Sequence, residues 1–111
     1  EWTAMSIAAQ IEASRHRAIA DAWASVLNTE SGRLVVWSIL EDCHLFAQTH
    51  LGNELDGLRA GMREVGLRIL NNRVFPHDVR TFADMQVEHA NLVDRLQKEA
   101  ALEAQEEQDD G

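Results

Sequence analysis

Residues 26–70 constrain the fold of this chain more than any other stretch, because they hold two helical patterns joined by a short loop. The first pattern, over residues 34–47, is apolar on most of its faces, which is typical of a buried helix. The second, over residues 53–72, carries apolar side chains at spacings of three and four, which mark one face of a helix. The sequence therefore predicts an antiparallel helical hairpin, with its core over about residues 28–72.

Longer helical patterns flank this hairpin on both sides. Residues 3–27 carry apolar side chains at spacings near four, with a polar interruption at residues 14–17, and residues 77–104 keep a three-four spacing through Leu96. The chain has one proline and no tyrosine. Abundant Ala, Leu, Glu and Arg favour helix, and no stretch alternates with the period of a strand. We therefore expect an all-α fold of three to four helices, in which the two flanking helices are long.

The charge of the chain is uneven along its length. The formal net charge is -9 over 111 residues, and six acids crowd the last dozen positions: Glu99, Glu103, Glu106, Glu107, Asp109 and Asp110. Blocks of like charge are usually solvated and disordered. We therefore expect a single helical domain over residues 1–98 and a frayed acidic tail over residues 99–111. The tail has two interpretations: a solubilising segment, or a segment that docks on a basic partner or stays clear of packaged nucleic acid.

Three glycines lie within the second hairpin helix, at Gly57, Gly61 and Gly66. Each glycine inside a helix costs about 1 kcal/mol relative to alanine, so their presence indicates the close approach of a neighbouring backbone. We expect the hairpin to pack through Gly57 and Gly61, with Gly66, Trp37 and Leu40 as further packing residues. Replacement of Gly61 by leucine is then expected to destabilise the fold by about 1–3 kcal/mol through overpacking.

Aromatic, apolar and basic side chains at several places along the chain suggest a surface for a partner. Three arginines lie off the apolar stripe of residues 53–72, tryptophan is enriched at interface hot spots, and the stripe of residues 77–104 suits a bundle helix or a helix that projects toward a partner. The predicted partner interface comprises Trp2, Arg59, Arg63, Arg68, Phe82, Met85, His89, Leu92 and Leu96.

No set of reactive side chains emerges from the sequence. The five histidines lack the helical spacing of a zinc site, only one cysteine is present, and no glycine-rich phosphate loop follows a strand. We therefore expect no enzyme activity, no cofactor and no metal. The negative net charge disfavours direct nucleic-acid binding, and no apolar run approaches the roughly 20 residues that span a bilayer.

Three short segments carry a resemblance to a known family: residues 27–33, Leu-Asn-Thr-Glu-Ser-Gly-Arg; residues 43–46, Cys-His-Leu-Phe; and residues 62–70, Met-Arg-Glu-Val-Gly-Leu-Arg-Ile-Leu. Within residues 26–70 the chain resembles a family of small proteins encoded in the head-morphogenesis region of tailed bacteriophages, which includes a Bordetella phage virion protein. The resemblance implies a small helical virion component, made in the host cytoplasm and present in several copies, that docks on portal, inner-head (capsid) or neck subunits. It carries over no catalytic residue.

The acidic charge leaves two other functions open. The chain fits a regulatory adaptor or a DNA-mimicking inhibitor that binds a host protein, and less well a small enzyme. Recovery of a single host DNA-binding protein in a pull-down would favour the adaptor or inhibitor, and recovery of portal or capsid subunits would favour the virion component.

Overall fold

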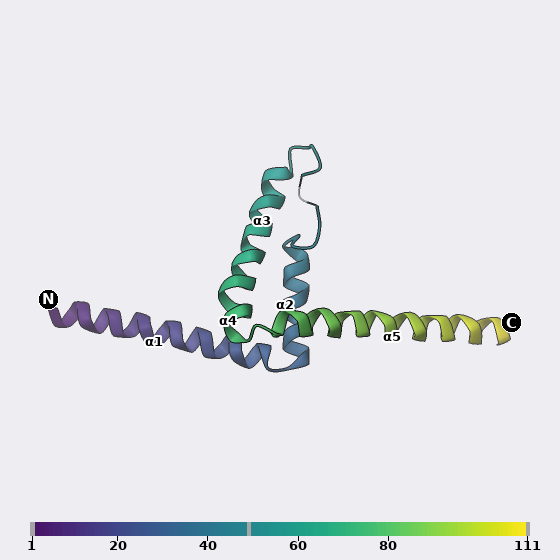
Figure 1. Ribbon diagram of the computed structural model, residues 1–111, viewed down its shortest axis with the longest axis horizontal. Helices are drawn as coiled ribbons and strands as arrows, with labels where there is room; N and C mark the ends of the chain where they lie inside the picture. Colours follow the sequence, from purple (N-terminus) through teal and green to yellow (C-terminus); the bar gives the residue numbers. More distant parts are fainter. Residues whose placement is uncertain (1, 49, 111) are drawn as a thin grey trace.

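The structure is a computed structural model that describes residues 2–48 and 50–110, with side chains from residue 6 onward. Within those ranges the chain is helical and contains no strand. The elements are α1 (Trp2–Leu27), α2 (Glu30–Asp42), α3 (Asp56–Ile69), the π-helix η1 (Leu70–Val74), α4 (Phe75–His77) and α5 (Thr81–Asp110). Helices α2 and α3 form an upright hairpin, and α1 and α5 leave its base in opposite directions (Figure 1). The predicted all-α fold with a central hairpin and long flanking helices is confirmed.

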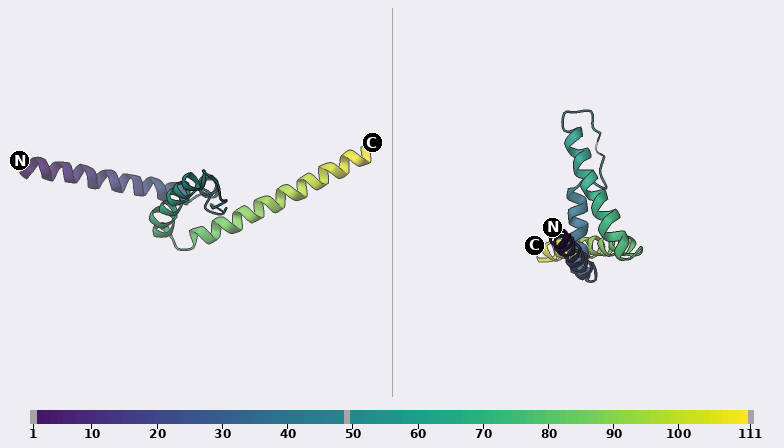
Figure 2. Two further views of the ribbon diagram at one scale, coloured as in Figure 1. Left: turned by 90° about the horizontal axis from the view of Figure 1, so that it is seen from above. Right: turned by 90° about the vertical axis from the view of Figure 1, so that its left-hand side faces the viewer.

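The molecule is elongated, with principal extents of 80 × 38 × 24 Å. Its radius of gyration is 20.6 Å, whereas a compact domain of this length has about 13 Å. Its accessible surface is 8320 Å², against roughly 6200 Å² for a compact monomer of the same mass. The two further views in Figure 2 show where the extra surface lies, because most of α1 and α5 extends away from the hairpin.

A small apolar core forms where the end of α1, the hairpin and the start of α5 meet. We call this core the hub; its buried members are Leu27, Val36, Trp37, Leu40, Leu70, Val74 and Met85, and Trp23, Leu45, Ile69 and Phe82 pack against them. The side chain of Leu40 is fully buried and that of Trp37 is 9% exposed. Both residues therefore lie at the helix contact, where the sequence places them.

The two long helices leave the hub as exposed rods. Every residue from 7 to 18 in α1 and from 93 to 110 in α5 is solvent-exposed. We call these stretches the α1 arm and the α5 arm. Ile11 in the first is 64% exposed and Leu96 in the second is 51% exposed, so apolar side chains on both arms lack cover from this chain.

The glycine contact expected at Gly57 and Gly61 is wrong. No other segment lies within 4 Å of the position that a Cβ would take at either residue. The reason is the geometry of the hairpin, because the N-terminal half of α3 rises beyond the end of α2 and has only the connecting loop beside it (Figure 1). Gly66 differs, since a Cβ there would lie 2.9 Å from the Cβ of Cys43. The close approach between α3 and the end of α2 occurs at Gly66.

The acidic C-terminal segment is also different from the expectation. Helix α5 continues through residues 99–110 to Asp110, the last described residue, where the sequence predicts a frayed tail. The physical reason is that Ala, Leu, Glu and Gln are strong helix formers, which offsets repulsion between exposed acids.

A single turn of π-helix joins α3 to α4. The backbone N–H of Phe75 donates to the carbonyl of Leu70, five residues back. Pro76 follows, and it has no N–H for the α-helical bond to Asn72. The wider turn at η1 brings both Leu70 and Val74 into the hub, so the chain passes the proline without leaving the core.

Candidate interaction site

The junction between α1 and α2 is built around a glycine. Thr29 caps α2, and its Oγ1 accepts a hydrogen bond of 3.0 Å from the backbone N–H of Gly32. A Cβ at Gly32 would lie 1.8 Å from the carbonyl oxygen of Val26 and 2.9 Å from Thr29 Oγ1. No side chain fits at that separation from a backbone oxygen. The turn therefore needs glycine at this position, and glycine fixes the angle at which α1 leaves the hub.

Arg33, the next residue, joins three helices. One guanidinium nitrogen donates to the carbonyl of Leu27 at the end of α1 (3.0 Å). The Nε donates to both carboxylate oxygens of Glu88 on α5 (2.9 and 3.0 Å), and Nη2 lies 2.7 Å from Oε1 of the same group. The hydrogen bonds with Glu88 raise the pKa of Arg33, although burial acts in the opposite direction. This two-pronged geometry is the strongest form of an arginine–carboxylate pair, and it fixes the direction in which α5 leaves the hub.

Aromatic stacking, in addition to that ion pair, holds α5 against α2. The Trp37 ring lies 4.6 Å from the Phe46 ring, 5.1 Å from the His89 ring and 6.0 Å from the Phe82 ring, measured between centroids. Met85, only 2% exposed, completes the contact. The expectation that Met85 belongs to a partner interface is therefore wrong, because its side chain is buried in the hub of its own chain. Phe82 and His89 are half-buried beside it, and a partner contact at these two residues stays a prediction.

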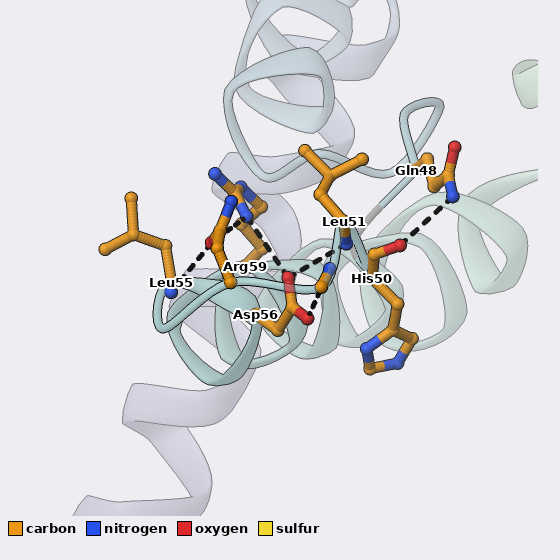
Figure 3. A network of polar contacts seen from close by, with 8 residues as sticks. Gln48, His50, Leu51, Leu55, Asp56 and Arg59 are labelled. Carbon is orange, nitrogen blue, oxygen red and sulfur yellow. Dashed lines mark hydrogen bonds and ion pairs between the residues drawn. The ribbon is translucent and has the colours of Figure 1, made fainter.

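The loop before α3 is organised by one carboxylate (Figure 3). Asp56 accepts hydrogen bonds from the backbone N–H groups of Leu51 (2.9 Å) and Gly52 (3.0 Å). The bond from Leu51 is the largest cause of a lowered pKa at Asp56, and burial opposes it. Arg59 donates to Asn53 at 3.0 Å and to Asp56 at 3.3 Å. Arg59, a member of the predicted partner interface, therefore has its guanidinium engaged in closing this loop.

The remaining predicted interface residues are found in different surroundings. Arg63 and Arg68 are exposed on α3, and Arg68 lies 3.6 Å from Glu64. Leu92 is half-buried beside the hub, whereas Leu96 is exposed on the α5 arm. The side chain of Trp2 lies outside the described part of the chain. The structure thus does not gather the predicted residues into one surface.

Two shallow grooves flank the hub. One, with a volume of about 320 Å³, lies between α2 and α5 and is lined in part by Leu34, Trp37 and Leu92. The other, of about 270 Å³, lies between α1 and the η1–α4 segment, where the Arg73 guanidinium is 6.0 Å from the Trp23 ring centroid. In the described ranges, no three His, Cys, Asp or Glu side chains gather in a way that could hold a metal ion. None of the helices described is both long enough and apolar enough to cross a bilayer.

Sequence reasoning missed the residues that orient the arms. Gly32, Arg33 and Glu88 appear in no predicted site, although the first two lie in residues 27–33, one of the segments that carry the family resemblance. A glycine in the first turn of a helix, three residues after its cap, is a signal of close approach that the sequence does contain. The partner of Arg33 lies 55 residues away, and no local pattern marks it.

Comparison with known proteins gives one match. Residues 23–86 match the family described as Bbp19-like phage protein, and neither the curated proteins nor the solved structures contain a match. The matched range begins at Trp23 and ends one residue after Met85, so it includes every residue of the hub. Both arms lie outside it. The resemblance expected over residues 26–70 is confirmed, and it extends to the whole hub.

Proposed function

The chain belongs to the Bbp19-like phage protein family, and from that premise we propose that it is a structural component of a tailed-phage virion. In this proposal the hub is a fixed joint, and the surfaces that extend from it dock on portal, inner-head or neck subunits. The protein acts through contact and carries out no reaction. It is made in the host cytoplasm and enters the particle in several copies.

The observation that supports this proposal most is the ratio of exposed surface to core. Among the residues whose side chains the structure describes, seven hydrophobic ones are buried, whereas large apolar side chains are exposed on every long helix. Ile11 on α1, Val35 on α2 and Leu58 on α3 are 64%, 56% and 62% exposed. Exposed apolar side chains on three helices supply surface that a protein partner can bury. In a virion, neighbouring subunits of the particle would cover such apolar surface.

The electrostatics of the arms agree with a position beside packaged DNA but without contact to it. Residues 93–110 contain seven acids and two bases, so the α5 arm repels a phosphate backbone. The same charge attracts a basic patch on a protein partner. Direct nucleic-acid binding is therefore not part of the proposal.

A pull-down during infection tests the proposal. A tagged copy of the chain is expressed from the phage genome, and the proteins that it retains are identified by mass spectrometry. We expect portal, capsid or neck subunits. A variant with Gly32→Ala, which distorts the hub, should retain much less of them, whereas Gly61→Ala, which changes an exposed position, should retain as much as the native chain. Recovery of a single host DNA-binding protein would contradict the proposal and favour the DNA-mimicking inhibitor.

A further inference from the structure

The two arms point in opposite directions from the hub, and this sets how copies of the chain can meet. Helix α1 runs from its tip toward the hub, and α5 runs from the hub toward its tip (Figure 1). When a second copy in the same orientation is displaced along the long axis of the molecule, the α5 arm of one copy overlaps the α1 arm of the next. The two helices then run parallel in the overlap.

A pair of aliphatic residues, four positions apart, is exposed on each arm. On α1 the pair is Ile7 and Ile11, and on α5 it is Leu96 and Ala100. A step of four residues fits the contact face of two packed helices, and the next residues on the same faces, Ser14 on α1 and Glu103 on α5, are polar. The register that places Leu96 opposite Ile7 therefore also places Ala100 opposite Ile11, and the aliphatic contact ends there.

Charge agrees with a contact between unlike arms. Arg15 on the α1 arm is 62% exposed, lies 3.3 Å from Glu12 of its own helix and is close to the face of Ile7 and Ile11. In the register that pairs Ile7 with Leu96, it falls at the level of Glu103 and Glu106. A pair of α5 arms would instead bring seven acids against seven acids, which is destabilising. The arms are thus complementary to each other and the α5 arm is not complementary to itself.

The exposed area is sufficient for two contacts per copy. The chain exposes 8320 Å², about 2000 Å² more than a compact monomer of its mass. A stable interface of standard size uses about 800 Å² from each partner. A copy that gives its α5 arm to one neighbour and receives an arm from another therefore has enough surface beyond the compact value.

We infer that this chain assembles head to tail with copies of itself, through parallel packing of the α5 arm of one copy along the α1 arm of the next. The contact is heterologous, so repetition produces a closed ring or an open filament. In this assembly the hub, which the family match covers, sets the angle between neighbouring copies. The arms, which lie outside the match, make the contact. The inference concerns the purified chain alone and does not depend on a virion partner.

Disulfide trapping tests this contact directly. Two single variants, Ile7→Cys and Leu96→Cys, are made in a Cys43→Ala background, mixed in equal amounts and oxidised gently with glutathione disulfide. We expect dimers that contain one copy of each variant, identified by different masses. Matched controls are Ala9→Cys and Ala101→Cys, which lie on other faces of the same arms and should give few dimers. A predominance of dimers of one variant with itself, or a yield no higher than in the controls, would overturn the inference.

Sedimentation velocity of the native full-length chain provides an independent measurement. We expect association that increases with concentration up to the millimolar range and weakens with salt. Arg15→Glu should raise the dissociation constant about tenfold, and addition of Glu103→Lys to the same chain should restore it. A native chain that stays monomeric throughout would overturn the inference and leave the virion proposal to its own test.

Discussion

Two substitutions of glycine by alanine, both inside helices, are expected to change stability in opposite directions. At Gly61 the new methyl group meets nothing within 4 Å. At Gly32 it would lie 1.8 Å from the carbonyl oxygen of Val26, a backbone atom that cannot rotate away. The pair isolates the effect of a close approach from the effect of helix propensity, which is shared by the two positions.

The expected magnitudes follow from that geometry. Gly61→Ala removes the conformational entropy of a helical glycine and should raise the free energy of unfolding by about 0.5–1 kcal/mol. Gly32→Ala gains the same amount, but the end of α1 must move by more than an ångström to admit the methyl group. Overpacking of that kind costs about 3 kcal/mol, so we expect a net loss of about 2 kcal/mol.

Urea unfolding followed by tryptophan fluorescence measures both values in a Trp2→Phe background, because the remaining Trp23 and Trp37 belong to the hub and report its unfolding separately from fraying of the arms. With seven buried hydrophobic residues, the hub belongs at the lower end of the usual 5–15 kcal/mol, so a loss of this size shifts the midpoint clearly. A Gly32→Ala variant as stable as the native chain would refute the close approach at the junction.

Four further predictions concern the hub and its surroundings. In a double-mutant cycle with Arg33→Ala and Glu88→Ala, urea unfolding should give a coupling energy of about 1–2 kcal/mol, because both groups are partly buried and their pairing is bidentate; additive effects would contradict the pairing. Gly61→Leu should raise the melting temperature of the isolated chain slightly, as alanine does, since leucine is a strong helix former and no helix lies against that position; a large drop by circular dichroism would show that one does. The lowered pKa of Asp56 means that its carboxylate stabilises the fold above the ordinary aspartate value of about 3.9, and that this contribution is lost as the pH falls through the lower folded-state pKa. The difference in midpoint between the native chain and Asp56→Asn should therefore shrink below about pH 4, and a constant difference would exclude the linkage. Removal of residues 99–111 should reduce helical circular dichroism but leave the urea midpoint of the hub unchanged, because residues 99–110 are exposed throughout.

The hairpin was predictable because both of its helices carry their apolar residues at helical spacings. Trp37 and Leu40 fall on the buried face of α2 for that reason. The position of closest approach was not predictable, because the connecting loop is long enough for half of α3 to extend past α2. Glycine spacing shows that a neighbour can come close, but it does not say whether one is present, and only Gly66 meets one.

The predicted partner interface on α5 loses Met85 to the hub for a related reason. A three-four stripe has the same form when it covers its own chain and when it meets a partner. Phe82 and His89 take the first role, and Leu96, farther along the same helix, is left exposed. The distance of each residue from the hub decides whether its side chain is covered by its own chain, and that distance depends on the tertiary fold.

The orientation of the arms depends on pairings that local patterns do not contain. Arg33 meets Glu88 only after the chain has turned through α2, α3 and η1. At the acidic end of α5 two local signals conflict, because the block of like charge indicates disorder while the residue types favour helix. In that segment the helix propensity of Ala, Leu, Glu and Gln prevails.

Quantitative mass spectrometry of density-purified particles tests the central claim most directly, with infected-cell lysate as the reference. If the chain is a structural component that works by contact, intact chain should be present in purified particles, at several copies and at a fixed ratio to the portal subunit from one preparation to the next. A chain that is abundant in the lysate but absent from the particles would contradict the claim.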